Sequence, residues 1–515
     1  MKRAFAAALV CLLAACRDSL APTSPTLVAA SGRPALVVTP AGVSYTAIDL
    51  GTLGGPVAQL IAINAAGQIA GTAQFDGLHA RAAFVDGGVL HDLGTLGGTI
   101  SQATALNTSG IVTGWSRMAD GTHHGFVWNG GAMIDLGTLD GDVESFGQAI
   151  NDNGVVVGSS YTTGFAHGTP FSWKDGVMTP MGTLGGSDSW PWAVNDNGVA
   201  AGFSYNVSEE QRPVIWQNGV PTDLGTFGGE FSEALDINDA GQVIGFSFTP
   251  NFEAHGFIWE NGTLTDLGSL GGYGVIPTEI NEHGDVVGSS LLANGSALHG
   301  FFWHEGVMQD IGTLPGFQNS VAYGINDNGQ VVGYAFNNDV GPVRAFLWEN
   351  GVMTDLGTLV NGNSASVDGP KSINNRGQII GSGSTGVPGE VHPILWQPSD
   401  PVINVTIDIR PGTAPNEISL SSNGVIPVAI LSTAGFDATT VDVATVRFGP
   451  GGAVESHGFG HMLDVNGDGI TDLMLHFRTQ DSGLACGATS AGIAGRTSSG
   501  RQIQGSDGIV TTSCQ

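Results

Sequence analysis

The chain is dominated by one unit that is repeated eight times. A phrase of the form D-L-G-T-L-G-G, or a close variant, begins at Asp49, Asp92, Asp135, Pro180, Asp223, Asp266, Asp310 and Asp355. Successive starts lie 43, 43, 45, 43, 43, 44 and 45 residues apart. A fixed period of this length is typical of repeat architectures, in which each unit buries its apolar face against its neighbours. The period therefore restricts the fold more strongly than composition does.

Two further phrases recur in a fixed order. The form I-N-x-x-G places an asparagine at Asn64, Asn107, Asn151, Asn195, Asn238, Asn281, Asn326 and Asn374. The form H-x-F-x-W closes the unit and is complete at residues 124–128, 255–259 and 299–303. Its histidine is replaced by Thr169, Arg212 and Arg344 in units three, four and seven. A position that varies in this way indicates packing rather than chemistry.

Each unit is read as four short strands. In the seventh unit, residues 321–325 and 330–334 flank an N-D-N-G hairpin signal, because Asn and Gly tolerate the positive φ of a tight turn. Residues 344–348 and 352–356 flank a second hairpin at E-N-G. Four strands in about 44 residues is the size of a propeller blade. We therefore predict an all-β chain with an eight-bladed β-propeller over residues 45–397.

The two ends of the repeat array predict that the ring closes. The eighth unit ends at residues 392–396 and has no fourth strand, whereas residues 45–50 carry a fourth-strand phrase with nothing before it. If residues 45–50 complete the eighth sheet, the array has no unpaired end. A linear solenoid would need capping units instead, and none is visible in the sequence.

The N-terminal segment has the pattern of a targeting signal. Lys2 and Arg3 precede an apolar run over residues 4–15, which is too short to span a bilayer core of ~30 Å. We expect a signal peptide over residues 1–15 and, from its Ala, Pro, Ser and Thr content, a flexible tether over residues 16–44. The ending L-A-A-C resembles the lipobox of bacterial lipoproteins, which implies that Cys16 becomes the lipidated first residue. The alternative is an ordinary secretory peptide that is cut elsewhere.

Charge and cysteine content restrict the partners and the compartment. The chain has 16 Lys+Arg against 46 Asp+Glu, a formal net charge of −30, which excludes nucleic acid binding by charge neutralisation. Outside the leader, two cysteines remain, Cys486 and Cys514. In an oxidising compartment they most simply form one disulfide. We expect an exported, monomeric protein that touches the membrane through its lipid anchor only, at the cell envelope or cell surface.

A different pattern begins near residue 402. Short runs of alternating apolar and polar residues, separated by Pro, Gly and Asn, predict a small β-sandwich-like domain over residues 402–515. The phrase D-V-N-G-D-G-I-T-D at residues 464–472 has the spacing of a calcium loop. Its expected Ca²⁺ ligands are Asp464, Asn466, Asp468, the Ile470 carbonyl and Asp472. The twelfth residue of the loop, which is a Glu in the full EF-hand pattern, is Leu475 here. The alternative to a calcium loop is a plain turn.

Two resemblances extend these patterns. The three recurring phrases over about residues 45–397 resemble the extracellular HAF repeat family, which implies an extracellular repeat fold and no assigned reaction. Residues 402–514 resemble a C-terminal domain found on many secreted bacterial proteins. That resemblance includes the His-rich turn at residues 457–461, the D-V-N-G-D-G phrase and the late cysteine pair. It implies where the protein works rather than what it does.

The motif search favours binding over catalysis. No G-x-S-x-G, H-E-x-x-H or C-x-x-C motif occurs, and we assign no catalytic residue. The low Lys+Arg count leaves few cations to stabilise a developing anion. We therefore expect a non-catalytic adhesion or envelope-organisation module whose ligand is a carbohydrate or a protein. The alternative is an extracellular propeller enzyme, a polysaccharide lyase or hydrolase, that uses one end of the channel.

Function is best sought where the units differ. The fourth unit carries Trp190 and Trp192 where other units have small residues, and both rings could stack on a sugar or peptide ring. The alternative is a local variation in packing. The repeated His, Asp and Asn side chains are expected to satisfy turns and neighbouring strands, because eightfold repetition spreads them around the ring.

Overall fold

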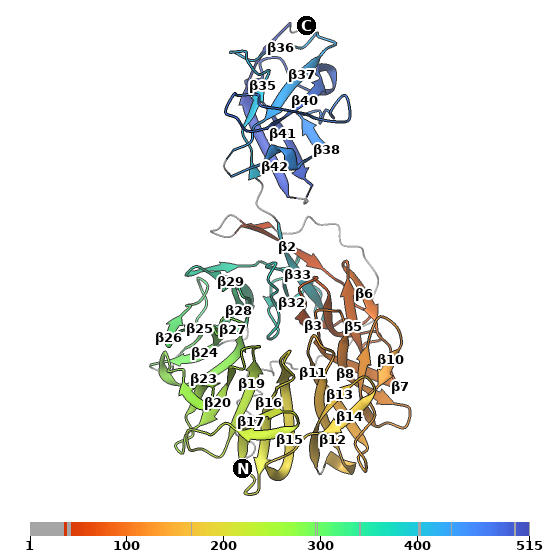
Figure 1. The fold of residues 1–515 in the computed structure, drawn as a ribbon, viewed down its shortest axis with the longest axis vertical. Coiled ribbons are helices and arrows are strands. Elements are labelled where there is room, and N and C mark those ends of the chain that lie inside the picture. Colours follow the sequence, from red (N-terminus) through yellow and green to blue (C-terminus); the bar gives the residue numbers. More distant parts are fainter. Residues whose placement is uncertain are drawn as a thin grey trace. The chain divides into compact units, whose positions relative to one another are not determined.

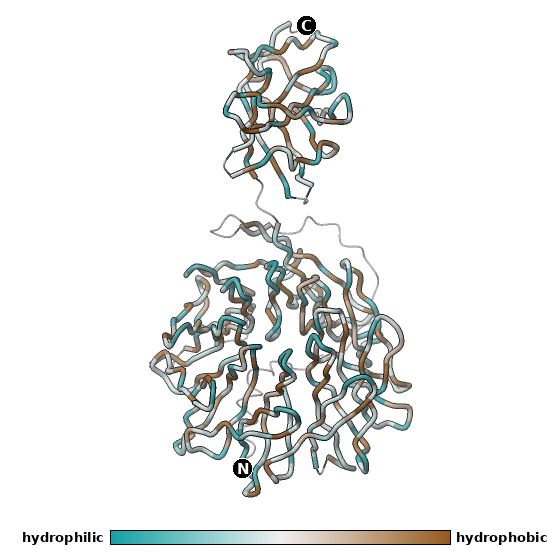
Figure 2. Tube along the Cα trace, viewed as in Figure 1, coloured by the Kyte–Doolittle hydropathy of each residue, from teal (hydrophilic) through white to brown (hydrophobic). Residues whose placement is uncertain are grey.

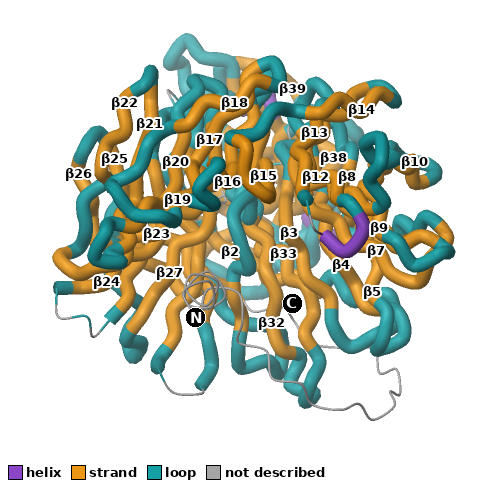
Figure 3. Tube along the Cα trace, turned by 90° about the horizontal axis from the view of Figure 1, so that it is seen from below, coloured by secondary structure: helices purple, strands orange, loops and turns teal. Residues whose placement is uncertain are grey.

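The chain folds almost entirely into strands. The computed structural model describes residues 36–38, 43–165, 167–293, 295, 297–338, 341–399, 403–433, 435–498 and 501–513. Within these ranges the helices are single 3-10 turns, η1 (Thr163–Phe165), η2 (Ala438–Thr440) and η3 (Thr479–Asp481). The prediction of an all-β protein is confirmed, as Figure 3 shows. No helix among the described residues is long and apolar enough to cross a membrane.

The chain divides into two compact units, one with Tyr45–Pro398 and the other with residues from Ser399 onward. In the first unit, seven four-stranded sheets follow one another along the described chain. The first sheet consists of β3 (Ala58–Ile63), β4 (Ile69–Gln74), β5 (Ala80–Asp86) and β6 (Val89–Asp92), and the second of β7 (Gly97–Leu106), β8 (Val112–Met118), β9 (His123–Trp128) and β10 (Met133–Asp135). The third consists of β11 (Glu144–Ile150), β12 (Val156–Tyr161), β13 (Gly168–Lys174) and β14 (Val177–Pro180), and the fourth of β15 (Gly185–Val194), β16 (Ala200–Asn206), β17 (Gln211–Gln217) and β18 (Val220–Asp223). The fifth consists of β19 (Ser232–Ile237), β20 (Val243–Phe248), β21 (Ala254–Glu260) and β22 (Thr263–Asp266), the sixth of β23 (Gly271–Ile280), β24 (Val286–Leu292), β25 (Leu298–His304) and β26 (Val307–Asp310), and the seventh of β27 (Asn319–Ile325), β28 (Val331–Phe336), β29 (Arg344–Glu349) and β30 (Val352–Asp355).

Each of these sheets is an antiparallel meander whose strands pair in chain order. Hydrophobic and hydrophilic residues alternate along the chain (Figure 2), and buried hydrophobic residues of neighbouring sheets form shared cores, as for Ile244 with Phe301. The second strand of each sheet carries a glycine that the packing requires. At Gly245 a Cβ would meet the carbonyl oxygen of Glu233 and would lie 2.6 Å from the Phe257 ring. The glycine therefore allows the third-strand aromatic ring to cover the sheet.

The eighth sheet joins the two ends of the repeat array. Its strand order is β1 (Leu36–Val38), β2 (Ser44–Asp49), β33 (Val391–Ser399), β32 (Ile379–Ser384) and β31 (Ala365–Ser366). The N-terminal strand thus takes the fourth-strand position beside β33, which is the pairing expected from the sequence. The Leu50 amide donates to the Pro393 carbonyl at 3.1 Å. The first and eighth sheets also share one core, in which Leu60 and Ile69 pack with Ile380.

Part of the predicted tether, residues 36–38, forms a strand. These residues form β1 beside β2, because the L-V-V sequence favours strand and the outer edge of β2 offers unpaired backbone groups. Residues 1–35, with the predicted signal peptide and Cys16, lie outside the described residues.

A cyclic chain of asparagines links all eight sheets. The Asn151 Oδ1 accepts the Val155 amide at 2.9 Å and so closes its own hairpin, while its Nδ2 donates to the Asn195 carbonyl at 2.8 Å in the next sheet. Every I-N asparagine donates in this way, and Asn374 returns to the Asn64 carbonyl at 2.9 Å. The donors in order are Asn64, Asn107, Asn151, Asn195, Asn238, Asn281, Asn326 and Asn374. The sheets therefore succeed one another around a common centre (Figure 1).

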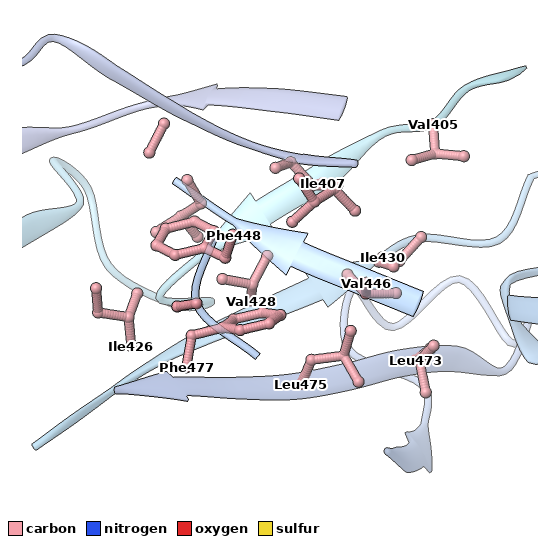
Figure 4. Packing of buried hydrophobic residues seen from close by; sticks show 14 of the residues in the cluster. Val405, Ile407, Ile426, Val428, Ile430, Val446, Phe448, Leu473, Leu475 and Phe477 are labelled. Atoms are coloured by element: carbon pink, nitrogen blue, oxygen red, sulfur yellow. The ribbon is translucent and has the colours of Figure 1, made fainter. Parts of the chain in front are cut away.

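The second unit has two four-stranded sheets and a strand pair over one core. The sheet orders are β34-β42-β41-β38 and β35-β37-β40-β39, with β36 beside β43. Their bounds are β34 (Ile403–Asn404), β35 (Ile407–Ile409), β36 (Glu417–Ser419), β37 (Val425–Ile430), β38 (Val441–Phe448), β39 (His461–Leu463), β40 (Asp472–Arg478), β41 (Ser490–Thr497), β42 (Gln502–Gly508) and β43 (Val510–Thr512). Phe448 and Phe477, from different sheets, stack with ring centroids 5.1 Å apart (Figure 4). This shared core holds the two layers together.

Candidate functional site

The two predicted ligand-binding tryptophans belong to one aromatic cluster on the third and fourth sheets. Trp190 and Trp192, both on β15, have ring centroids 5.6 Å apart. Trp190 also lies 5.7 Å from Tyr161 on β12 and 6.1 Å from Phe146 on β11. Phe165 in η1 lies 5.4 Å from Tyr161. We call Phe146, Tyr161, Phe165, Trp190 and Trp192 the aromatic cluster.

The cluster combines one buried ring, two half-buried rings and two exposed rings. Tyr161 is 5% exposed, whereas Trp192 is 39% and Phe165 is 53% exposed. Burial, together with the neighbouring Asp188 carboxylate, raises the pKa of Tyr161 above its usual value. Buried Tyr161 contacts Phe165, and half-buried Trp190 contacts Trp192, so each exposed ring packs against a ring that is less exposed.

Two polar groups lie at the aromatic cluster, the indole nitrogen of Trp190 and the carboxyl group of Glu233. Among the described residues, the buried Nε1 of Trp190 makes no hydrogen bond with the protein. Glu233 on β19 is 6% exposed and accepts from Gln211 Nε2 at 2.9 Å. Burial raises the pKa of Glu233 to about 7, although hydrogen bonds from Gln211 and Trp192 act in the opposite direction. Near neutral pH this carboxyl group can therefore accept or donate a hydrogen bond.

A separate ion cluster lies between inner strands of different sheets. The Lys371 Nζ is 3.1 Å from Asp236 Oδ2 and 3.0 Å from Glu279 Oε1, while the Lys371 carbonyl accepts from the Ile63 amide at 3.0 Å. Loss of hydration lowers the pKa of Lys371, but the two carboxylates outweigh it and hold the pKa above its usual value. The segment between β31 and β32 thus connects sheets five, six and one.

The repeated histidines are structural partners of the repeated aspartates. His124 Nδ1 lies 2.9 Å from Asp135 Oδ1, eleven residues later on the neighbouring strand of the same sheet. Arginine serves where histidine is absent, as in Arg212, whose Nε lies 3.0 Å from Asp223 Oδ2. The other pairs are Arg81–Asp92, His255–Asp266, His299–Asp310, Arg344–Asp355 and His392–Asp49. No two of these pairs share a partner, as expected for side chains that serve their own sheet.

The predicted calcium loop is closed by its own hydrogen bonds. The Asp464 Oδ1 accepts the Gly467 amide at 2.7 Å, and Asn466 Nδ2 donates to Asp468 Oδ2 at 2.9 Å. The Ile470 amide donates to Asp468 Oδ1 at 2.8 Å. Asp472 is fully buried, and its two oxygens accept the backbone amides of Ser432 and Val465. The loop residues are together, and calcium binding stays a prediction.

Three histidines that sequence reasoning did not assign converge next to that loop. His457, His461 and His476 each offer a ring nitrogen, and these nitrogens lie within 4.8 Å of one another. His461 begins β39 and His476 lies on β40. Burial and the positive charges of His457 and His461 lower the pKa of His476. We call these residues the three-histidine cluster.

The predicted disulfide involves a residue beyond the described part of the chain. Cys486 is described, whereas Cys514 lies outside the described residues, so the pairing stays a prediction. Sequence reasoning also missed Glu233 and Lys371. A signal for Glu233 existed, because the equivalent inner-strand position is uncharged in the other repeats, whereas Lys371 lies in the segment between β31 and β32 and had none.

Comparisons with known proteins do not assign a family. No family model and no curated protein matches the chain. Among solved structures, the β-propeller domain of the Trilobed protease from Pyrococcus furiosus shares 10% identity, with 58% of this chain and 97% of that chain covered and a TM-score of 0.39. The SapL1 lectin in complex with alpha methyl fucoside shares 12% identity, with 59% and 96% covered and a TM-score of 0.30.

A third similar structure is the Pyrococcus horikoshii acylaminoacyl peptidase, with 11% identity and a TM-score of 0.37. The alignment covers 74% of this chain and 59% of the peptidase, so the chain matches only about three-fifths of that protein. All three TM-scores are below 0.5, and these similarities carry no argument about the activity of this chain.

Proposed function

We propose that the protein is a non-catalytic, lipid-anchored cell-surface module that binds carbohydrate at the aromatic cluster. In this proposal the first unit is an eight-bladed β-propeller of the HAF repeat type, and the second is an appended β-sandwich-like domain. The cyclic asparagine chain from Asn64 to Asn374 and the core shared by the first and eighth sheets support the closed ring. The rigid ring would hold the aromatic cluster in one geometry.

The observation that carries the binding proposal is the exposure of Trp192 and Phe165 beside the buried ring of Tyr161 and the half-buried ring of Trp190. Sugar rings present C–H faces that stack on aromatic side chains, and their hydroxyl groups need hydrogen-bond partners. With a net charge of −30, the protein repels polyanions, so we expect a neutral glycan rather than an acidic one.

The charged groups at the centre of the ring argue for binding rather than catalysis. Asp236 and Glu279 converge from two sheets, but the ammonium of Lys371 lies within 3.1 Å of both and neutralises much of their charge. The ion pairs with Lys371 engage both carboxylates, so neither is free to act on a substrate. They act as a link between sheets in this proposal.

A hydrolase or lyase remains the second candidate because of Glu233. A carboxyl group with a pKa of about 7 suits general acid or base chemistry at neutral pH. Substitution Glu233→Gln separates the two candidates. A binding module keeps its glycan affinity within a few fold, whereas an enzyme loses turnover of the same glycan while still binding it.

The binding test uses an array of immobilised neutral and acidic oligosaccharides and the full exported chain. We expect Trp192→Ala and Phe165→Ala to reduce binding to the retained glycans by at least about tenfold, because each removes a stacking surface. Phe252→Ala is the matched control, since Phe252 is 70% exposed in the loop between β20 and β21 and lies outside the cluster. Binding that is equal in all three variants would place the ligand elsewhere, and an array without any retained glycan would favour a protein partner.

The envelope location rests on Cys16 and is tested separately. In the proposal Cys16 carries the lipid, a Cys486–Cys514 disulfide closes the C-terminal domain, and the monomer has no other membrane contact. We expect Cys16→Ser to move the protein from the detergent phase to the aqueous phase or to leave it unprocessed. Unchanged partitioning of the variant would contradict the anchor.

A further inference from the structure

The three-histidine cluster has the arrangement of a metal site that no motif predicts. The ring centroids of His457 and His476 lie 5.2 Å apart, and those of His461 and His476 lie 5.4 Å apart. The planes of these two pairs are inclined by 55° and 80°, so the rings do not stack. Rings in tilted and edge-to-face arrangements leave nitrogens free to point into the space between them. All three nitrogens lie within 4.8 Å of one another.

Separate backbone elements hold the three rings in place. His461 pairs with Met474 in the antiparallel register of β39 and β40, which places it next to the strand that carries His476. On its other side, β40 pairs with β37, where His476 faces Pro427. The Ser456 amide donates to the His476 carbonyl at 2.8 Å, which fixes the neighbouring His457 beside the same strand.

Two features favour a cation between these rings. The Nδ1 of His476 is buried and, among the described residues, has no hydrogen-bond partner. A buried nitrogen without a partner costs free energy that a bound cation would recover. The carboxylate of Glu455, whose side chain is only 2% exposed, lies 3.4 Å from His457 Nδ1 and 4.0 Å from His476 Nδ1. It places a negative charge beside the rings, as outer carboxylates of histidine metal sites do.

We propose that His457, His461 and His476 bind one divalent transition-metal ion, such as Zn²⁺, through one nitrogen of each imidazole. The fourth position is open to water or to an outside ligand, because His457 and His461 are exposed. Imidazole nitrogen is a preferred ligand of Zn²⁺, Cu²⁺ and Ni²⁺, whereas Ca²⁺ selects oxygen. The three-histidine cluster and the predicted calcium loop at residues 464–472, the acidic loop, therefore select different ions.

The geometry needs only a small adjustment. Tetrahedral zinc with Zn–N distances near 2.1 Å requires nitrogens about 3.4 Å apart. The exposed side chains of His457 and His461 can rotate to close the remaining distance, while the strand position of His476 stays unchanged. The site is independent of the glycan proposal, because it lies in the other unit of the chain.

The test is zinc titration of the full-length, untagged chain against a chromogenic zinc chelator. We expect one Zn²⁺ per chain at micromolar or lower dissociation constant. His457→Ala and His461→Ala should each weaken zinc binding at least about tenfold, and the double variant should abolish it. Substitution of Co²⁺ should give the intense visible absorption of a tetrahedral ion, which the variants should lose.

The controls separate this site from the other groups in the chain that could bind a cation. Asp468→Ala removes a carboxylate of the acidic loop, and His255→Ala removes a histidine of the repeat unit; both should bind zinc as the wild type does. Metal-free melting temperatures show that the exposed-histidine variants are folded. Wild-type affinity in His461→Ala, loss in Asp468→Ala alone, or no zinc binding by the wild type would each overturn the proposal.

Discussion

The Nδ1 of His392 lies 2.9 Å from both carboxylate oxygens of Asp49, which is 343 residues away in the chain. In the other sheets the equivalent pair is eleven residues apart, as in His299 with Asp310. The same contact that joins the third and fourth strands of a repeat therefore also joins the last repeat to the N-terminal strand. In the third unit the histidine position is Thr169 and the aspartate position is Pro180, so both members of the pair are absent together.

The His392–Asp49 pair should protect its two strands from hydrogen exchange more than the equivalent pairs within a single repeat protect theirs. We expect Asp49→Ala to lower the free energy of unfolding by about 0.5 kcal/mol, a small value because Asp49 is 38% exposed and solvent screens the pair. Hydrogen exchange should rise across β2 and β33. Asp266→Ala is the control, since its strands are joined by a tight hairpin. Equal exchange changes around both substitutions would mean that the N-terminal strand is held without the pair.

The stability of the first compact unit, Tyr45–Pro398, should decrease in alkaline solution. The hydrogen bond to Asp135 raises the pKa of His124, and the hydrogen bond to Asp49 raises the pKa of His392. A raised folded-state pKa gives stabilisation that is complete below the unfolded value of about 6.5 and is lost as pH rises through the folded value. Denaturant unfolding at pH 6 and pH 8.5 measures the loss. The double variant His124→Asn with His392→Asn should show a smaller difference; an unchanged one would contradict the assignment.

At low pH the stability from the same pairs changes in the opposite direction, because the aspartate then becomes protonated. Burial alone would raise the pKa of Asp49, but hydrogen bonds from His392 and Gly51 outweigh it and lower the pKa. Its contribution is therefore complete above the unfolded value of about 3.9 and is lost as pH falls through the lowered value. Stability from these pairs should be greatest between about pH 4 and 6.5.

Removing the cation of the central ion cluster should destabilise the ring. Lys371→Met leaves Asp236 and Glu279 without their partner, and these side chains are only 9% and 5% exposed. We expect a loss of about 2 kcal/mol, less than for a fully buried pair because the Lys371 side chain is 53% exposed. The triple variant with Asp236→Asn and Glu279→Gln should recover most of the loss. A triple variant no more stable than Lys371→Met would show that charge is not the cause.

The second-strand glycine should not tolerate a methyl group. Gly245→Ala would press a Cβ against the Glu233 carbonyl and the Phe257 ring, and overpacking of this kind costs about 1–3 kcal/mol. Gly131→Ala is the control, because no atom lies within 4 Å of a Cβ placed there. Chemical denaturation of both variants measures the difference. A Gly245→Ala protein as stable as the control would show that Phe257 can move aside.

Calcium should stabilise the second unit if the acidic loop binds it. At ten times its dissociation constant an ion adds about 1.4 kcal/mol to the folded state. Calorimetry of the full chain should show one transition that rises by several degrees in millimolar Ca²⁺ relative to chelator, with Mg²⁺ much less effective. Asp468→Ala should abolish the shift. Identical melting of the wild type in calcium and chelator would reduce the motif to a turn.

The amino-acid sequence by itself determined the repeat unit, the all-β class and the pairing of the N-terminal strand with the last repeat. These follow from local signals, because hairpins such as residues 326–329 are encoded within a few residues and because counting strands shows which repeat lacks one. The structural role of the repeated His and Asp was also readable, since side chains that recur at equivalent positions around the array cannot meet at one point.

Only the tertiary structure decided which distant side chains meet. Lys371 reaches Asp236 and Glu279 because an irregular segment in the eighth repeat crosses to other sheets, and no period predicts such a crossing. The spacing of His457 and His461 was visible, but their third partner, His476, arrives on β40 through strand pairing. Contacts between sheets depend on how the ring closes and on strand register, and these are set by the summed packing of the chain rather than by any local pattern.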